Sequence, residues 1–223
     1  MKVFLDLGAF DGDSVELARS RFGDIDKFYA FEPLCRSFER LERRFGEWDR
    51  AVLIRAAADT RDGEQELFLG DQFGDLGGSL CPEKINCKEE SERVLTIDLA
   101  RFIRETFSEE DEILLKIDIE GKEYDLLEHL IATGTIQRIS RLYCEWHWNR
   151  VAVPRARHDR LLRRLNKLGF YLTGVNSYDE FMRTRRRRDL LTRTRFALGK
   201  RAAWLKLLLR STIQHGTQQR TSG

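Results

Sequence analysis

Short apolar runs that alternate with stretches of helical periodicity are the feature that most constrains this sequence. The runs VFLDL at 3–7 and EILLKIDIEG at 112–121 suit buried strands, whereas residues 13–22 and 123–131 carry apolar side chains at helical spacing. This alternation is typical of βαβ units built around a parallel sheet. The sequence therefore predicts an α/β fold with a doubly wound, mostly parallel sheet and helices on both faces.

The remaining segments extend that pattern. Residues 71–91 contain several glycines and a proline without periodicity, which predicts a long loop. Residues 94–103 read as a strand end that runs into a helix. Further strands are expected at 28–31, 52–57, 63–70 and 139–147, further helices at 34–46 and 155–168, and a closing hairpin at 171–175 and 180–182.

Charge is distributed unevenly along the 223 residues, which suffice for one α/β domain. Residues 183–223 hold twelve Lys or Arg and one acid, Asp189, so this segment carries +11 and the rest of the chain −9. The sequence predicts a domain at 1–182 followed by a basic amphipathic tail at 183–223.

A stripe of leucines and alanines interrupts the basic residues of the tail and predicts a C-terminal helix at about 187–210. Two interpretations stay open for this helix. It could contact a membrane surface or a partner, with Trp204 near its apolar side, or it could pack on the acidic body of the protein.

The four cysteines, Cys35, Cys81, Cys87 and Cys144, fit no zinc-ligand spacing, so no metal site is predicted. The N-terminus does not resemble a signal peptide, and no apolar run approaches the roughly 18 residues of a membrane span. We therefore expect a cytoplasmic protein, peripheral to the inner face of the membrane if the tail binds lipid.

The stretch DLGAFDGDS at 6–14 follows the first strand directly and contains Gly8 and Gly12 in the pattern G-x-x-x-G. A glycine turn between a strand and a helix places backbone N–H groups beside a ligand. The pattern differs from the dinucleotide fingerprint G-x-G-x-x-G, and the acids around it would repel a diphosphate. It favours a ligand that carries a positive charge.

The stretch FEP places Glu32 at the end of the second strand, twenty residues after Gly12. A carboxylate at this position of such a fold accepts hydrogen bonds from the hydroxyls of a ribose. A cationic, ribose-containing ligand without a pyrophosphate indicates S-adenosylmethionine. The alternative is that Asp6, Asp11 and Glu32 are ordinary loop and cap residues of an α/β protein.

Five segments, in the order DLGAFDGDS, FEP, AAAD, GGSL and LLKIDIEGKEYDLL, resemble the FkbM family of S-adenosylmethionine-dependent methyltransferases. The resemblance covers about residues 3–147. It implies a class I, Rossmann-like methyltransferase fold, O-methylation, and acceptors that are often sugars or other polyhydroxylated compounds.

The resemblance also implies which residues bind the cofactor. Asp6, Gly8, Gly12 and Ser14 would line its methionine end, Glu32 its ribose, and the segment around Asp59 the edge of its adenine. The full set of expected cofactor-binding residues is Asp6, Gly8, Ala9, Gly12, Ser14, Glu32, Pro33, Asp59 and Asp118.

The stretch KIDIEG supplies candidate catalytic residues. Period two on a central strand would place Lys116, Asp118 and Glu120 on one face, at the end of the strand that opens toward a ligand. The alternative is that Lys116 neutralises one of the two acids in the interior. An alcohol that attacks a methyl group must lose its proton, and the candidate acceptors are Asp118, Glu120, Glu145 and His147.

Two further alternatives concern the EWHWN stretch and the reaction. His147 could instead be packed between Trp146 and Trp148, which would also suit stacking on a sugar. The predicted function is O-methyl transfer to a saccharide, glycolipid or similar metabolite. An RNA methyltransferase or a non-catalytic scaffold anchored by the tail are the alternatives, and the acidic body disfavours a nucleic-acid partner.

Overall fold

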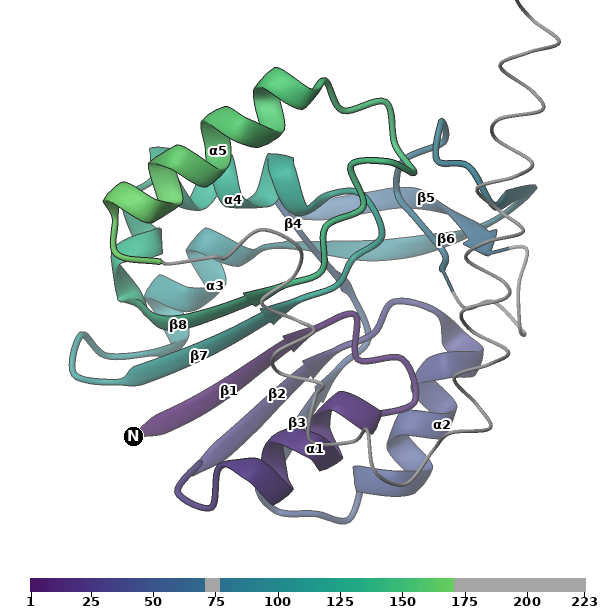
Figure 1. Cartoon of the computed structure of the whole chain (residues 1–223). Coiled ribbons are helices and arrows are strands. Elements are labelled where there is room, and N and C mark those ends of the chain that lie inside the picture. Colours follow the sequence, from purple (N-terminus) through teal and green to yellow (C-terminus); the bar gives the residue numbers. More distant parts are fainter. Residues whose placement is uncertain (71–76, 171–223) are drawn as a thin grey trace, which may run out of the picture. The chain divides into compact units, whose positions relative to one another are not determined.

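The computed structural model describes residues 1–70 and 77–170, all of which belong to the first of two compact units, Met1–Met182. Figure 1 shows this unit as a twisted sheet between two layers of helices. Three expectations lie outside the described residues: the domain boundary at 182/183, the hairpin at 171–175 and 180–182, and the helix at 187–210.

The main sheet has five strands, all parallel to their neighbours. These strands are β1 (Lys2–Leu7), β2 (Lys27–Phe31), β3 (Ala51–Ile54), β7 (Glu112–Ile117) and β8 (Ile139–Cys144). Their order is β3-β2-β1-β7-β8, so the chain builds outward in one direction from β1 and in the other from β7. The carboxyl ends of β1 and β7 therefore form the topological switch point, where ligands bind in such sheets.

A second sheet of three strands lies beyond the carboxyl edge of the first (Figure 1). Its strands are β4 (Ala57–Asp59), β5 (Gly63–Gly70) and β6 (Cys87–Asp98), in the order β4-β6-β5. The single strand predicted at 52–57 is wrong, because β3 and β4 are separate strands in different sheets. The loop predicted at 71–91 is too long, since β6 already pairs with β5 at Cys87.

Helices cover both faces of the main sheet, as the sequence predicts (Figure 1). On one face lie α1 (Asp13–Arg21) and α2 (Cys35–Phe45); on the other lie α3 (Leu99–Thr106), α4 (Glu123–Ala132) and α5 (Arg155–Lys167). A 3₁₀ turn, η1 (Thr135–Arg138), precedes β8. Within the described ranges no helix combines the length and the apolar character that crossing a bilayer requires.

Strand β1 carries side chains that pack against the helices on both faces of the main sheet. Val3, Leu5 and Leu7 pack into the core under α3, α4 and α5, whereas Phe4 packs into the core under α1 and α2. All four side chains are fully buried. Each such burial stabilises the fold by about 1.5–3 kcal/mol. Asp6 shares the face of Phe4, so it is a buried acid among the apolar residues 3–7 of the strand.

The N-cap residue of helix α1 makes no side-chain hydrogen bond. The residue before the helix is Gly12, at φ +87°, and neither Asp13 nor Ser14 caps it. The hydroxyl of Ser14 donates instead to the buried carboxylate of Asp6. A Cβ on Gly12 would lie 2.3 Å from Cε2 of Phe45 in α2. Gly12 is thus required by a left-handed backbone and by contact between the glycine loop and α2.

We expect Gly12→Ala to lower the free energy of unfolding by about 1–3 kcal/mol, because it combines backbone strain with overpacking. Gly23→Ala is the matched control, since a Cβ there meets nothing within 4 Å. Urea unfolding of both variants, followed by circular dichroism, measures the difference. Equal stability of the two variants would contradict the packing role of Gly12.

Candidate active site

The loops that follow β1 and β7 touch each other at the switch point. The backbone N–H of Asp118 donates to the carbonyl of Leu7 at 3.1 Å, and the N–H groups of Gly8 and Ala9 donate to the carbonyl of Phe31 at 3.0 and 2.9 Å. A Cβ on Gly8 would lie only 2.0 Å from the carbonyl oxygen of Asp118. Glycine at this position therefore lets the ends of β1, β2 and β7 come together.

Glu32 holds the glycine loop against the end of β2. Its side-chain oxygens accept hydrogen bonds from the backbone N–H groups of Phe10 at 2.9 Å and Leu34 at 3.0 Å. Burial raises the pKa of Glu32 to about 7, although those hydrogen bonds and the charge of Lys116 oppose the shift and Asp6 adds to it. Each carboxylate oxygen retains a second lone pair for a further donor.

Asp6 and Lys116 form an ion pair in the interior, between neighbouring positions of β1 and β7. Nζ of Lys116 lies 2.9 Å from Oδ1 of Asp6 and 3.7 Å from Oδ2 of Asp118, and it also donates to the carbonyl of Gly8 at 2.8 Å. Burial alone would lower the pKa of Lys116, but the charges of Asp6 and Asp118 raise it. The alternative reading of Lys116 as an internal counterion is therefore supported, with Asp6 as its nearest acid.

A cavity opens at the switch point between these loops and the second sheet. Its lining is mostly apolar and includes the acids Glu32, Asp118 and Glu120. Its described lining residues are Gly8, Phe10, Phe31, Glu32, Pro33, Leu34, Ala56, Ala57, Ala58, Leu67, Gly77, Gly78, Leu80, Asp118, Ile119, Glu120 and Lys122. Residues 77, 78 and 80 belong to the predicted loop at 71–91, so part of that loop borders the cavity.

The structure divides the residues predicted to bind a cofactor into two groups. Gly8, Glu32, Pro33 and Asp118 border the cavity. The other five are not among its lining residues. In this second group, Asp6 and Ser14 are hydrogen-bonded to each other, and Asp59 accepts a hydrogen bond from Gln65. Ala9 is buried, and Gly12 packs on α2. The five residues of the group are Asp6, Ala9, Gly12, Ser14 and Asp59.

The four predicted catalytic residues come together just beyond the ends of β7 and β8. Asp118 and Glu120 follow the last residue of β7, and Glu120 has a left-handed φ of +56°. Glu145 and His147 follow the last residue of β8. The prediction that these side chains extend from strands is wrong, because β7 ends at Ile117 and β8 at Cys144. Loops place them at the same edge instead, and we call these four residues the acidic cluster.

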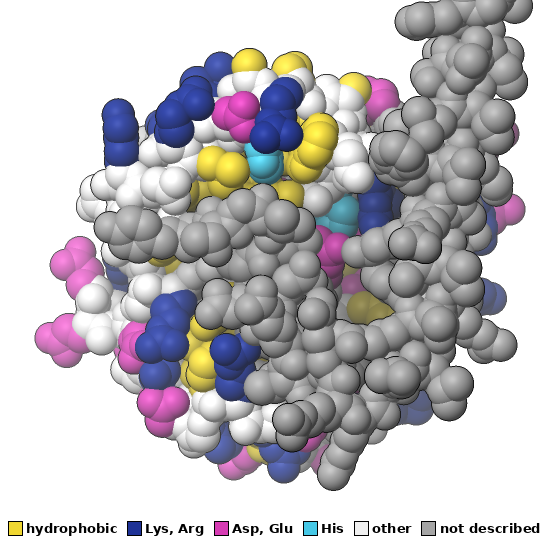
Figure 2. Space-filling model, in the orientation of Figure 1, with side chains coloured by type: hydrophobic (Ala, Val, Ile, Leu, Met, Phe, Trp, Pro, Cys, Tyr) yellow, Lys and Arg dark blue, Asp and Glu magenta, His cyan; other side chains and the backbone are white. Residues whose placement is uncertain are grey.

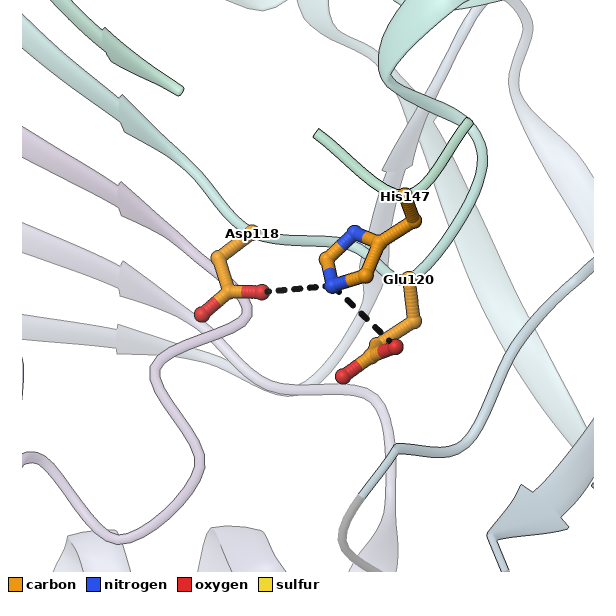
Figure 3. Close-up of side chains that lie close together, drawn as sticks. All are labelled: Asp118, Glu120 and His147. Atoms are coloured by element: carbon orange, nitrogen blue, oxygen red, sulfur yellow. Dashed lines mark ion pairs between the residues drawn. The ribbon is translucent and has the colours of Figure 1, made fainter. Parts of the chain in front are cut away.

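His147 is the centre of the acidic cluster and is 1% exposed. Its Nδ1 donates to Oε1 of Glu123 at 2.7 Å. Its Nε2 lies 3.3 Å from Oε2 of Glu120 and 3.8 Å from both Oδ1 of Asp118 and Oε1 of Glu145. Figure 3 shows the side chains of Asp118 and Glu120 directed toward the imidazole.

The neighbouring tryptophans do not enclose His147, in contrast to the alternative considered from the sequence. The rings of Trp146 and Trp148 lie 5.3 and 5.9 Å from the ring of His158. Trp146 also packs on Tyr124, whereas Trp148 is 36% exposed. His147 is thus surrounded by acids.

The charges of the acidic cluster shift its pKa values in different directions. Burial and the charge of Glu145 raise the pKa of Asp118 to about 7. Burial opposes ionisation of Glu120 as well, but the charges of His147, Lys84 and Arg150 bring its pKa to about 2. Burial would lower the pKa of His147, yet Glu123 and Glu120 raise it to about 9. The cluster is therefore a place where protons and cations compete for carboxylates.

Three residues that support the acidic cluster escaped the sequence analysis. Glu123, at the start of α4, is fully buried and also accepts the N–H of Gly121 at 3.0 Å. Nζ of Lys84 and Nη1 of Arg150 each lie 3.2 Å from Oε2 of Glu120. The signal that could have identified Glu123 is the presence of an acid at the first, buried position of a helix. Nothing in the spacing indicates Lys84 or Arg150, because distant loops bring them in.

We expect Lys116→Met to lower the free energy of unfolding by about 3–5 kcal/mol, because it leaves the carboxylate of Asp6 buried without its counterion. Lys2→Met, which breaks a surface pair with Asp24, is expected to cost less than about 1 kcal/mol. Asp6→Asn in the Lys116→Met background should recover part of the loss. Guanidinium unfolding measures all three, and a Lys116→Met protein as stable as Lys2→Met would contradict the role of the pair.

Comparison with known proteins adds a family to this geometry. The family model described as the methyltransferase FkbM domain matches residues 6–172, about three quarters of the chain. A solved methyltransferase FkbM from Methylobacillus flagellatus KT is similar, with a TM-score of 0.46 and 14% identity over 73% of this chain. The chain spans 38% of the length of that protein. No curated protein sequence gives a significant match. Because the family model matches more than half of the chain, this protein belongs to the FkbM methyltransferase family.

Proposed function

We propose that this protein transfers the methyl group of S-adenosylmethionine to a hydroxyl of a saccharide, glycolipid or similar polyhydroxylated metabolite. The observation that carries the proposal is the position of Glu32, a buried carboxylate that borders the switch-point cavity beside the glycine loop. S-adenosylmethionine supplies an activated methyl group on a positively charged sulfur. The residues around the cavity fit the parts of such a donor.

Glu32 and the apolar lining suit the adenosine part. The carboxylate retains lone pairs for ribose hydroxyls after it has accepted the N–H groups of Phe10 and Leu34. The apolar part of the lining is built from small and branched side chains that suit a flat base. These are Leu34, Ala56, Ala57, Ala58, Leu67 and Leu80.

The charges of the cavity suit the sulfonium. Glu32, Asp118 and Glu120 border the cavity, and Lys122 is the single cationic residue among its described lining residues. An acidic lining attracts a positively charged ligand and repels a diphosphate. The lining thus favours this donor over a dinucleotide.

The acidic cluster suits a hydroxyl acceptor. In methyl transfer the acceptor oxygen forms the new bond to carbon while the bond from carbon to sulfur breaks, with its electron pair remaining on sulfur. The protein must hold the two partners in line and take the hydroxyl proton. Asp118 and Glu120 border the cavity, and Glu145 and His147 lie against them. A carboxylate of the cluster is the group that receives the proton.

The direct test uses the full chain with methyl-labelled S-adenosylmethionine and panels of saccharides, glycolipids and RNA. The proposal expects label on a hydroxyl of a saccharide or glycolipid. Label on RNA would support the nucleic-acid alternative, and donor binding without transfer to any acceptor would support a scaffold. Either of these results would overturn the proposed acceptor class.

Removal of the Glu32 carboxylate tests the donor site. We expect Glu32→Ala to weaken S-adenosylmethionine binding about 10- to 100-fold, the loss of one or two charge-assisted hydrogen bonds. Glu92→Ala is the control, because Glu92 also accepts a backbone N–H at the start of α2, from Cys35 at 3.2 Å, but does not border the cavity. Calorimetry on both folded variants measures the affinities, and equal affinities would refute the ribose role.

The raised pKa of Glu32 gives this prediction a pH dependence. Above pH 7 the carboxylate is ionised and is a strong acceptor; below pH 7 it binds a proton and becomes a weaker one. Affinity for the donor should therefore fall about tenfold from pH 8 to pH 6, the change in the ionised fraction of a group with this pKa. Lys116 and Asp6, the charged groups that act on Glu32, are paired with each other. An identical fall in Glu32→Ala would assign the effect to another group.

Asp118→Asn tests the acidic cluster. We expect the variant to fold but to turn over about 10²- to 10⁴-fold more slowly, because it removes a carboxylate from the place where the hydroxyl loses its proton. Asp24→Asn is the control, since the Asp24 side chain is 70% exposed and pairs with Lys2 at the opposite end of β1 from the cavity. Full activity of Asp118→Asn would remove this residue from the mechanism.

The location and the tail complete the proposal. We propose a cytoplasmic enzyme that approaches a glycolipid or lipid-linked acceptor through the basic tail, because a positive amphipathic segment is attracted to anionic lipid. The tail lies outside the described residues, so this part rests on the sequence alone.

A further inference from the structure

Three side chains of the acidic cluster are arranged like ligands of one ion. One oxygen of Asp118, one oxygen of Glu120 and Nε2 of His147 all lie within 4.8 Å of one another (Figure 3). Ligand atoms at about 2.1 Å from a metal ion are about 3 Å apart when adjacent and about 4.2 Å apart when opposite. The observed 3.3 and 3.8 Å from Nε2 to the two carboxylates fall in that range.

We propose that Asp118, Glu120 and His147 bind a divalent metal ion. The sequence did not suggest this site, because its residues come from two loops and follow no ligand spacing. The inference stands on the convergence of the three side chains, on the state of the imidazole and on the lack of a close cation at Asp118.

The imidazole of His147 is held as metal-bound histidines are held. Its Nδ1 donates to Glu123 at 2.7 Å, and Glu123 is itself fixed by the N–H of Gly121. Such a carboxylate orients the ring and directs the lone pair of the other nitrogen toward the metal. Nε2 is buried and has no hydrogen-bond partner within the part of the chain that the structure describes. A buried polar atom of this kind is costly unless a ligand satisfies it.

Asp118 needs a cation that the described residues do not bring close. Lys116 is 3.7 Å from its carboxylate but only 2.9 Å from Asp6, and His147 is 3.8 Å away. Lys84 and Arg150 both contact Glu120. Among the residues that the structure describes, no cationic side chain reaches hydrogen-bond distance from Asp118. A divalent ion between Asp118 and Glu120 would supply the missing charge.

The donor set favours manganese among the common divalent ions. Carboxylates suit magnesium, calcium and manganese, whereas imidazole suits the first-row transition metals. Calcium requires six to eight oxygen ligands, and zinc sites with three protein ligands are built mostly from histidine or cysteine rather than from two carboxylates. Two carboxylates and one imidazole leave coordination positions open for water or a substrate oxygen.

Figure 2 shows histidine, acidic and basic side chains next to one another in one small area of this face. Asp118 and Glu120 also border the cavity proposed for the methyl donor. The role of the ion rests on the proposed function: it would bind the acceptor hydroxyl and lower the pKa of that hydroxyl. The proton would pass to Glu145, the carboxylate of the cluster outside the ligand set, 3.8 Å from Nε2 of His147.

The test measures metal binding without any substrate. Full-length protein is stripped with a chelator, and free Mn²⁺ is followed by electron paramagnetic resonance during a titration. We expect one Mn²⁺ per chain, with at least tenfold weaker binding in Asp118→Asn and in Glu120→Gln. Glu123→Gln should weaken binding about 10- to 100-fold through the orientation of His147. Asp24→Asn should bind like the wild type, and circular dichroism confirms that each variant is folded.

The outcomes separate this proposal from the proposed function. Wild-type protein that leaves the free Mn²⁺ signal unchanged, or Asp118→Asn and Glu120→Gln proteins that bind with wild-type affinity, would overturn the metal site. Binding of S-adenosylmethionine, measured in the presence of the chelator, tests the donor site independently. Mn²⁺ binding without donor binding would uphold the metal site and refute the methyl-donor assignment, and the reverse result would do the opposite.

Discussion

The ion pair between Asp6 and Lys116 is the interaction on which the rest of the site depends. It joins β1 and β7 at neighbouring positions of the sheet, where both residues are almost completely buried. Lys116 also donates to the carbonyl of Gly8, and Asp6 accepts the hydroxyl of Ser14 at the start of α1. A buried pair of this kind adds little net stability, but it fixes the loops that follow β1 and β7 relative to each other.

In this arrangement, the residue that supports the glycine loop from the interior differs from the residues that border the cavity. Asp6, which the sequence predicts to bind the cofactor, holds the glycine loop in place. Glu32, at the end of the next strand, borders the cavity and also anchors that loop through the N–H of Phe10. The acidic side chains that border the cavity are therefore Glu32, Asp118 and Glu120, at the carboxyl ends of β2 and β7.

Much of this could be predicted from the sequence, because strand periodicity and glycine turns are local signals. The parallel sheet, an inner strand that begins at residue 112 and the helices on both faces follow from patterns of a few residues each. The positions of Glu32 and Asp118 at the cavity follow from their place at strand ends. The FkbM family is confirmed by the family match.

What could not be predicted depends on contacts between distant segments. The division of 52–57 into strands of two sheets follows from the pairing of β4 with β6, whose paired residues are 39 positions apart in the sequence. The burial of His147 against Glu123, and the approach of Lys84 to Glu120, come from loops that no spacing links. Sequence periodicity also extended β7 to residue 121, whereas the left-handed backbone at Glu120 turns the chain at the site.

The central claim is that the switch-point cavity takes a positively charged, ribose-containing methyl donor. The most direct measurement is thermal unfolding of the full chain with S-adenosylmethionine, S-adenosylhomocysteine or NAD, since a ligand that binds only the folded state raises its melting temperature. The account predicts a concentration-dependent rise with the first two compounds and none with NAD. An unchanged melting temperature with S-adenosylmethionine, or an equal rise with NAD, would contradict it.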